Sequence, residues 1–138
     1  MSEFRLQVIT PRRIVKDEII QSISTPSADG MITILPRHTR ILTLLVEGII
    51  TIKRKDGEES LAIGGGYLET DGSLVRILVS RAYGQDEINH EQTELALEEA
   101  KKLVSQANTK EDRQNALSVL RRSVIDSKLI KKRRKNII

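Results

Sequence analysis

Hydrophobic and polar residues alternate in short runs along the first 80 or so residues of the chain. The run 4–10, FRLQVIT, places Phe4, Leu6 and Val8 on one face of an extended strand. Similar runs, at least partly alternating, occupy 14–25 as one longer segment, and then 31–35, 41–63, 67–69 and 74–80. Turn signals at Lys55-Asp56-Gly57 and Asp71-Gly72-Ser73 separate some of them. Many short strands without a helical period predict an all-β sandwich or flattened barrel over about residues 1–85.

The pattern changes near residue 84, where apolar residues begin to recur three or four positions apart, as in an amphipathic helix: Leu97, Ala100, Val104 and Ala107. Asn89 followed by Gln92 is typical of a helix N-cap, and Thr109 followed by Asp112 gives a looser version of the same signal. A second apolar stripe comprises Leu117, Leu120 and Val124. The pattern predicts an antiparallel two-helix hairpin over about residues 88–138.

Composition narrows the possible functions. Aromatic residues make up only 2% of the chain, so the core must be aliphatic and little is available to stack on nucleic-acid bases. There is no cysteine, which excludes disulfides and thiolate metal sites. The first residues lack the pattern of a signal peptide, and no run approaches the roughly 18 apolar residues of a membrane span. We therefore expect a soluble, unsecreted protein.

Charge is unevenly distributed. The formal net charge is +4, but residues 1–87 carry a net charge of −1 and residues 88–138 a net charge of +5. Six cations and no acid follow from residue 128 onward: Lys128, Lys131, Lys132, Arg133, Arg134 and Lys135. Three interpretations stay open, namely a solvated helix end, a docking arm for an acidic protein surface, and a nucleic-acid patch.

Catalytic, metal and phosphate sites find little support. Gly64-Gly65-Gly66 precedes a strand rather than a helix, which favours a bend where backbones approach closely over a phosphate loop. His38 and His90 fall in different predicted domains, and Ser27 lacks the surroundings of a hydrolase nucleophile. Adjacent acids such as Glu58-Glu59 are explained by opposite faces of a strand. We predict no catalytic residue, no metal and no cofactor.

The order of parts over essentially the whole chain resembles the epsilon subunit of the F-type ATP synthase, which is called delta in mitochondria. Residues 28–38, ADGMITILPRH, are similar to a family segment that reads Glu-Gly-Glu-Leu-Gly-Ile-Leu-Pro-Gly-His, and they retain Gly30, Pro36 and His38. Residues 64–69, GGGYLE, are similar to its Gly-Gly-x-x-Glu segment, and 74–79 to the strand that follows. The extended start and the closing hairpin complete the resemblance.

The resemblance implies a rotor subunit of the central stalk without catalysis of its own, coupling c-ring rotation to ATP synthesis in a proton-translocating complex. Its sandwich would bind the gamma subunit and the c-ring, and the implied interface residues are Asp29, Gly30, Met31, Pro36, His38 and Thr43. It would be a peripheral protein, on the cytoplasmic side of a bacterial inner membrane or the stromal side of a thylakoid, without homo-oligomers. Thr33 and Arg37 replace family glycines and Met31 an acidic residue, so contacts to the c-ring are expected to differ in detail.

The family's hairpin lies folded on the sandwich or extends along gamma, where it inhibits ATP hydrolysis at the alpha and beta subunits. The resemblance therefore favours the docking-arm interpretation of the basic residues Arg121, Arg122, Lys128, Lys131, Lys132, Arg133, Arg134 and Lys135. Some members bind ATP through an Ile/Leu-Asp-x-x-Arg-Ala motif, which here reads Ile88-Asn89-His90-Glu91-Gln92-Thr93. Both charged members are missing, so we predict weak or absent ATP binding.

Two alternatives to the rotor interpretation stay open. The first is a free-standing β module whose basic hairpin binds nucleic acid, which a salt-sensitive shift of DNA or RNA would favour. The second is an enzyme whose site assembles from scattered residues, which turnover by the isolated chain would favour.

Overall fold

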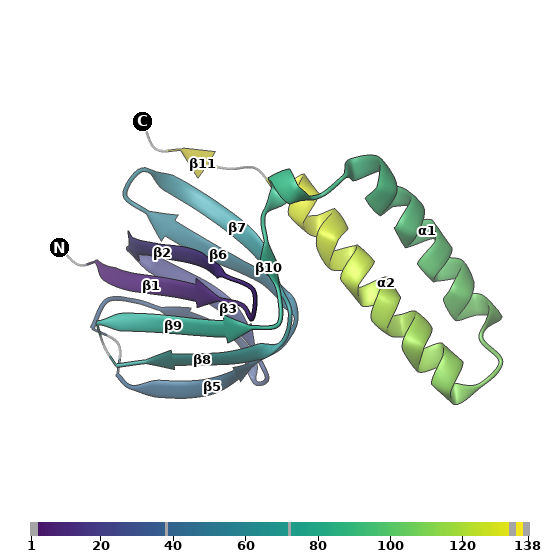
Figure 1. Ribbon diagram of the computed structural model, residues 1–138, viewed down its shortest axis with the longest axis horizontal. Helices are drawn as coiled ribbons and strands as arrows, with labels where there is room; N and C mark the ends of the chain where they lie inside the picture. The colour runs from purple at the N-terminus through teal and green to yellow at the C-terminus, as the bar shows by residue number, and fades with distance from the viewer. Residues whose placement is uncertain (1–2, 38, 72, 133–134, 137–138) are drawn as a thin grey trace. The chain divides into compact units, whose positions relative to one another are not determined.

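The computed structural model describes residues 3–37, 39–71, 73–132 and 135–136. The chain divides into two compact units, residues 1–84 together with 133–138, and residues 85–132. The first unit contains the strands and the second the helices, and each is described by itself (Figure 1). The β-then-α fold class expected from the sequence is therefore confirmed.

The strands of the first unit wrap into two layers. Their bounds are β1 Phe4–Ile9, β2 Ile14–Ile20, β3 Ser22–Ser27, β4 Gly30–Ile34, β5 Ile41–Leu45, β6 Gly48–Arg54, β7 Gly57–Ile63, β8 Gly66–Thr70, β9 Leu74–Val79, β10 Ala82–Tyr83 and β11 Lys135–Asn136. One layer has the order β5-β8-β9-β1-β2, in which only the β1–β9 pair is parallel. The other has the order β10-β7-β6-β3, with β4 on β3 and β11 on β7. Strand β3 pairs with both β6 and β5, so the two layers are continuous.

The core lies between the layers and is aliphatic apart from Phe4. The alternating positions of each strand supply it, as Leu6 and Val8 do for β1. The largest fully buried side chains of this unit are Leu6, Ile20, Ile23, Ile34, Ile50, Ile52, Ile63, Leu68 and Ile77. Burial of aliphatic side chains is the main term that stabilises the sandwich.

The segment 14–25, predicted as one extended run, consists of two strands that meet at Gln21. Ile20 and Ile23 are both fully buried. In one straight strand, two residues that are three positions apart would point to opposite faces, so they could not both enter the same core. A bend at Gln21 resolves this conflict, and its N–H donates to the Lys53 carbonyl at 2.7 Å. The chain there leaves β1 as its partner and joins β6 in the other layer.

Thr25 on β3 is a polar residue within this core. Its side chain is fully buried, and its Oγ1 has no hydrogen-bond partner among the residues that the structure describes. A buried hydroxyl without a partner costs free energy because it has lost its hydrogen bonds to water.

Replacing Thr25 by valine is expected to raise the free energy of unfolding by about 1 kcal/mol, since the shape is kept and an unpaired hydroxyl is removed. Urea unfolding measures the change. Thr93→Val is the matched control, because the Thr93 hydroxyl is also buried but donates to the Asn89 carbonyl at 2.8 Å. The control should lose stability, and a loss in Thr25→Val would show that its hydroxyl is satisfied.

The second unit is a helical hairpin. It contains a 3-10 turn at Gln85–Glu87, α1 at His90–Gln106 and α2 at Lys110–Lys131. Both predicted N-caps are confirmed, because Asn89 Oδ1 accepts from the Gln92 N–H at 2.9 Å and Thr109 Oγ1 from the Asp112 N–H at 3.0 Å. Small residues occupy most of the buried helix positions: Thr93, Ala100, Ala116, Ser123 and Ser127. Neither helix is long and apolar enough to span a bilayer.

The predicted hairpin range, 88–138, extends past the end of α2. The helix ends at Lys131, Lys132 is an extended C-cap, and Lys135–Asn136 pair with Glu58 and Gly57 of β7. Lys131 and Lys132 lie three and four positions after Lys128, and like charges at this spacing repel each other in a helix and oppose its continuation.

Candidate functional site

The turn between β3 and β4 gathers three of the predicted interface residues. The Ser27 hydroxyl donates to the Gly30 carbonyl at 2.6 Å and accepts from the Asp29 N–H at 3.2 Å. Gly30 has a φ of 116°, a conformation that glycine adopts without steric cost. Asp29, Gly30 and Met31 are all exposed at this turn. They form an exposed tip that combines the carboxylate of Asp29 with the apolar side chain of Met31.

A hollow of about 340 Å³ lies beside this turn, between β4 and β5. It is lined by Ser27, Asp29, Ile32, Thr33, Ile34, Ile41 and Thr43, and we call it the β4–β5 gap. The structure thus brings Asp29 and Thr43, two predicted interface residues, to the same site. Pro36 is half-buried in the loop that joins the two strands, and His38 lies outside the described residues.

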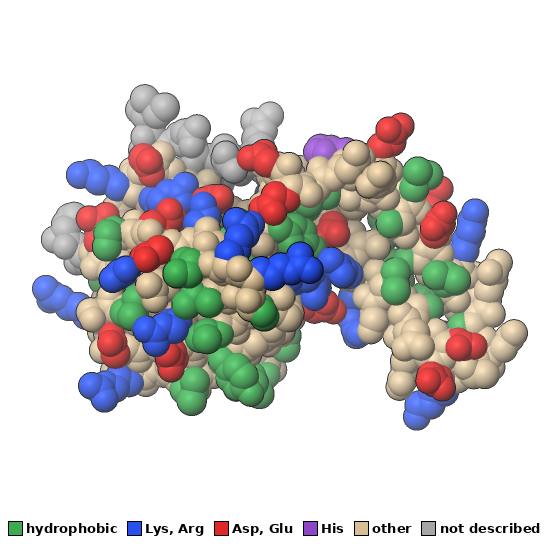
Figure 2. Space-filling view, viewed as in Figure 1, with side chains coloured by type: hydrophobic (Ala, Val, Ile, Leu, Met, Phe, Trp, Pro, Cys, Tyr) green, Lys and Arg blue, Asp and Glu red, His purple; other side chains and the backbone are tan. Residues whose placement is uncertain are grey.

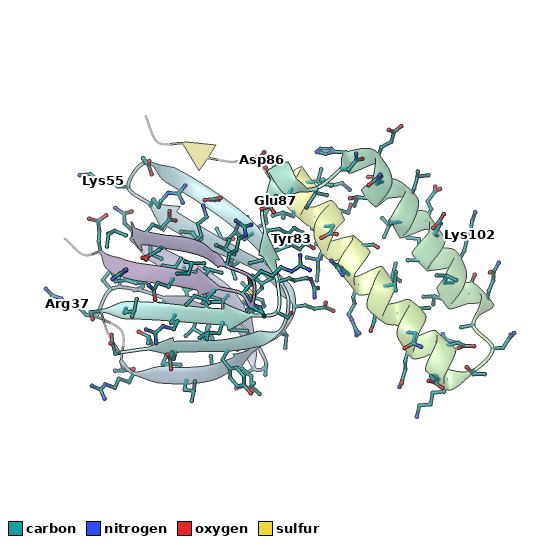
Figure 3. The ribbon with its side chains drawn as sticks, in the orientation of Figure 1. Arg37, Lys55, Tyr83, Asp86, Glu87 and Lys102 are labelled. Carbon is teal, nitrogen blue, oxygen red and sulfur yellow. The ribbon has the colours of Figure 1, made fainter. Side chains whose placement is uncertain are left out.

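Arg37 in the same loop has an unusual backbone conformation. It is the non-glycine residue with a positive φ, 63°, among those that the structure describes. Its side chain points away from the sandwich (Figure 3). This is a position where the resemblance led us to expect glycine, and a side chain in the left-handed region costs about 1–2 kcal/mol.

Replacing Arg37 by glycine is expected to raise the free energy of unfolding by about 0.5–1 kcal/mol, because the relief of strain exceeds the entropy that glycine adds to the unfolded chain. Thermal and urea unfolding measure it. Lys55→Gly removes one cation at another exposed turn position, where Lys55 itself does not have a positive φ, and it should lower stability by about 0.5 kcal/mol. Equal effects of the two changes would contradict the strain at Arg37.

An apolar strip crosses the outer face of the β5-β8-β9-β1-β2 layer. Strand register places its five residues side by side, one from each strand: Leu44, Tyr67, Leu78, Ile9 and Ile14. The exposed fraction is 52% for Leu44, 54% for Tyr67 and 41% for Leu78. Figure 2 shows hydrophobic side chains gathered over this face. A contiguous exposed apolar surface of this kind marks a protein interaction site.

The sequence interpretation did not identify this strip. Residues 41–45, ILTLL, are apolar on both faces of β5, so alternation alone cannot tell the core face from the exposed one. The strip also combines residues from distant strands, and their alignment follows from strand register rather than from spacing along the chain.

Charged pairs border the apolar strip. In the next row along the strands, Arg76 Nη1 lies 2.7 Å from Glu69 Oε1. Further along the sheet, Arg5 Nε lies 2.8 Å from Asp17 Oδ1, and hydrogen bonds from Arg5 and Gln7 hold the pKa of Asp17 below its usual value. The strip is therefore an apolar row with a polar border, as in protein interfaces.

A second charged cluster joins the two layers and is structural. Glu59 Oε1 accepts from Lys16 Nζ at 2.8 Å and from Arg54 Nη1 at 2.9 Å, and Arg54 also reaches Glu18 at 2.9 Å. Burial alone would raise the pKa of Glu59, but the hydrogen bonds and charges of Lys16 and Arg54 outweigh it and hold this pKa below its ordinary value. All four side chains are paired, so the cluster links β2 to β6 and β7.

The glycine run at 64–66 is a close contact between strands. A Cβ on Gly66 would lie 1.9 Å from the Leu78 carbonyl oxygen, and one on Gly64 would lie 2.1 Å from Ser80 Oγ. Strand β8 begins at Gly66, with no helix following the run. The expected bend with close backbone approach is confirmed.

The positions of the ATP-binding motif have structural roles here. The Asn89 side chain caps α1, and buried Thr93 donates to the Asn89 carbonyl. Weak ATP binding stays a prediction. Among the residues that the structure describes, no group of three or more His, Cys, Asp or Glu side chains is placed to hold a metal ion.

The basic residues of α2 are exposed where they are described: Arg121, Arg122, Lys128, Lys131 and Lys132. Arg121 Nη2 donates to Ser118 Oγ at 3.1 Å. Arg133, Arg134 and the side chain of Lys135 lie outside the described residues. The described part of the basic face is therefore accessible to solvent.

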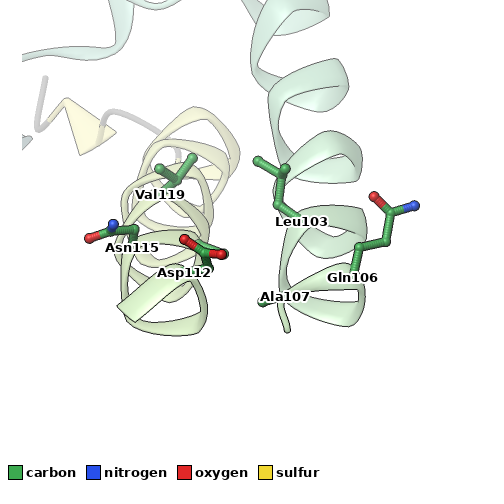
Figure 4. Close-up of a pocket in the computed structure, with 7 residues that line it drawn as sticks. Leu103, Gln106, Ala107, Asp112, Asn115 and Val119 are labelled. Carbon is green, nitrogen blue, oxygen red and sulfur yellow. The ribbon is translucent and has the colours of Figure 1, made fainter. Parts of the chain in front are cut away.

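The hairpin also has a shallow groove near its loop (Figure 4). Its volume is about 380 Å³, Leu103 of α1 and Val119 of α2 lie on its two sides, and Ala107 and Ala116 also line it. Leu103 and Val119 are exposed. This groove is therefore part of the apolar contact between α1 and α2.

Comparison with known proteins identifies the family. Residues 3–85 match the model of the ATP synthase Delta/Epsilon chain, beta-sandwich domain. The chain is 33% identical to the ATP synthase epsilon chain of Moorella thermoacetica over 90% of its own length and 93% of that protein. It is 32% identical to the ATP synthase epsilon chain of Herpetosiphon aurantiacus over 94% and 96% of the two chains.

Solved structures share the fold. A chain of the Euglena gracilis mitochondrial ATP synthase, OSCP/F1/c-ring, superposes with a TM-score of 0.79 at 22% identity, over 92% of this chain and 79% of that one. A chain of the Tetrahymena thermophila mitochondrial ATP synthase central stalk and c-ring gives a TM-score of 0.66 at 15% identity, over 93% and 96%. With a family model that covers most of the chain and relatives matched along nearly their whole length, the chain belongs to the family of ATP synthase delta/epsilon chains.

Proposed function

We propose that this chain is the central-stalk subunit that binds gamma and the c-ring through its sandwich and restrains ATP hydrolysis through its hairpin. As a member of its family it is a non-catalytic subunit of the F-type ATP synthase. The observation that carries the proposal is the apolar strip on the outer face of the sandwich. A subunit that transmits torque needs a broad, stable contact rather than a reactive group.

Gamma would dock on the apolar strip. Leu44, Tyr67 and Leu78 expose large apolar side chains in adjacent strands, and Tyr67 in the centre has the properties of an interface anchor. The ion pairs beside the apolar strip would form the polar rim of this interface. Burial of this surface by a partner removes apolar area from water, which is the main driving force of stable association.

The tip at Asp29, Gly30 and Met31 would contact the polar loops of the c-ring. Its charge, exposure and fixed turn suit recognition by hydrogen bonds and shape. Met31 makes this contact more apolar than the acidic residue that the resemblance led us to expect at this position would. The subunit would then be peripheral to the membrane, on the cytoplasmic side in a bacterium or the stromal side in a plastid.

Binding of gamma is tested with the full chain and its variant Tyr67→Glu. A charge within the apolar strip is expected to weaken binding to purified gamma at least tenfold. Leu95→Glu, which places the same charge on an exposed leucine of α1, should change it less than twofold. Equal binding by the two variants, with unfolding midpoints unchanged, would rule out the strip as the gamma-binding face.

The hairpin would restrain hydrolysis through the basic face of α2, which is complementary to acidic surfaces of the alpha and beta subunits. Replacing Lys128, Lys131 and Lys132 together by glutamine should raise the ATP hydrolysis rate of the assembled complex several-fold. Lys101 and Lys102 of α1, replaced in the same way, serve as the control. An unchanged rate in the α2 variant would remove this part of the proposal.

A further inference from the structure

Strand β4 has one edge whose backbone groups are unpaired. The Pro26 carbonyl accepts from the Val46 N–H and the Ala28 N–H donates to the Leu44 carbonyl, so these residues of β3 face β5. By alternation the backbone of Ser27 and Thr25 faces β4, where they are aligned with Gly30 and Ile32. The N–H and C=O groups of the intervening β4 residues, Met31 and Thr33, therefore point away from β3.

No other described strand pairs with this edge, since β4 pairs with β3 alone. Natural sheets protect exposed edges with charges, prolines or very short strands. Strand β2, at one end of the sheet, carries the charged run Lys16-Asp17-Glu18, and β10, at the other end, has two residues. Strand β4, with the sequence GMITI, has five residues and no charge or proline. An unprotected edge of this kind is a template for another strand.

The β4–β5 gap lies directly beside this edge. Ile32, Ile34 and Ile41 give it an apolar lining, and Ser27 and Thr43 add hydroxyl groups. Side chains point alternately to the two faces of a strand. A segment paired with Met31 and Thr33 would thus direct every second side chain into the gap.

Charge at the two ends of β4 favours one class of ligand. Asp29 lies in the turn before the strand, and Arg37 and Arg40 lie in the loop after it, all exposed. An extended segment with an acidic residue near the C-terminal end of β4 complements Arg37 and Arg40. The reverse arrangement would set its acid against Asp29.

We propose that β4 accepts an extended segment of gamma by β-strand addition, with alternate apolar side chains in the β4–β5 gap and an acidic residue facing Arg37 and Arg40. The inference rests on the proposed function and deepens it, because it names how one part of gamma is held. Backbone hydrogen bonds to Met31 and Thr33 supply the pairing, and the gap and the charges supply the selectivity.

Amide hydrogen exchange of the full chain, alone and with purified gamma, tests the inference. Alone, the Met31 and Thr33 amides should exchange rapidly while those of Ile32 and Ile34, which face β3, are protected. With gamma, exchange at Met31 and Thr33 should slow at least a hundredfold. If gamma binds and these two amides stay fast, the inference is wrong while the proposed function stands. If gamma does not bind, both fail.

Two variants at one residue distinguish backbone pairing of gamma with β4 from burial of this edge by gamma without pairing. Thr33→Pro removes the outward N–H and leaves the backbone hydrogen bonds between β4 and β3 in place, and both Thr33 variants lose the hydrogen bond between the Thr33 and Ser24 hydroxyls. It should weaken gamma binding at least tenfold. Thr33→Val keeps the backbone donor and should bind within twofold of the natural chain. Equal binding by the two variants overturns the inference. The exchange experiment uses the natural sequence, so it stays decisive even if Thr33→Pro does not fold.

Discussion

Replacing Gly66 by alanine is expected to lower the free energy of unfolding of the sandwich by about 3 kcal/mol, because a Cβ cannot fit without displacing backbone. It would lie 1.9 Å from the Leu78 carbonyl oxygen and 2.8 Å from Val79 Cα, both on the neighbouring strand β9. A flexible side chain could move aside, but these atoms belong to a paired strand. The register of β8 and β9 must shift or open. Urea unfolding measures the loss.

Gly65→Ala is the matched control for Gly66→Ala. A Cβ on Gly65 would meet the Leu45 carbonyl oxygen at 3.5 Å, an ordinary van der Waals distance. Gly65 is exposed, so the change should cost little. Similar losses at the two positions would mean that chain flexibility, rather than close approach, decides their effect.

The glycine run shows what a sequence pattern can predict well. Three glycines before a strand pointed to close backbone approach, and Gly66 shows it, while a Cβ on Gly64 would meet the side chains of Ser80 and Arg81. The starts of the helices could be predicted equally well, because an N-cap is a local interaction between residues three positions apart, as in Asn89 and Gln92. Features that depend on neighbours in sequence were predicted correctly.

Features that depend on distant partners were missed. The bend at Gln21 follows from pairing with β6, and the apolar strip from the register of five strands. The positive φ of Arg37 could not be read from its residue type, which disfavours that conformation. The interface role of Asp29 and Thr43 stays a prediction, although both residues line one hollow. The apolar strip was not predicted.

Replacing Glu59 by glutamine is expected to lower the free energy of unfolding by about 2–3 kcal/mol at pH 7, because it leaves Lys16 and Arg54 without their shared carboxylate. Glu59 is 8% exposed and accepts hydrogen bonds from both cations, so solvent can replace little of what is lost. Urea unfolding at pH 7 measures the change. Glu69→Gln is the control, because its ion pair with Arg76 is half-exposed and should contribute less than about 1 kcal/mol.

The effect of Glu59→Gln should depend on pH in a defined direction. The pKa of Glu59 is lower in the folded chain than the ordinary value near 4.5, so the contribution of its charge is complete above that value. As the pH falls below it, protonation of the folded state removes the contribution. The natural chain should therefore progressively lose its advantage over Glu59→Gln as the pH is lowered from about 4.5 through the depressed pKa of Glu59. A difference that does not decline as the pH falls below 4.5 would show that the side chain stabilises the sandwich by packing rather than by charge.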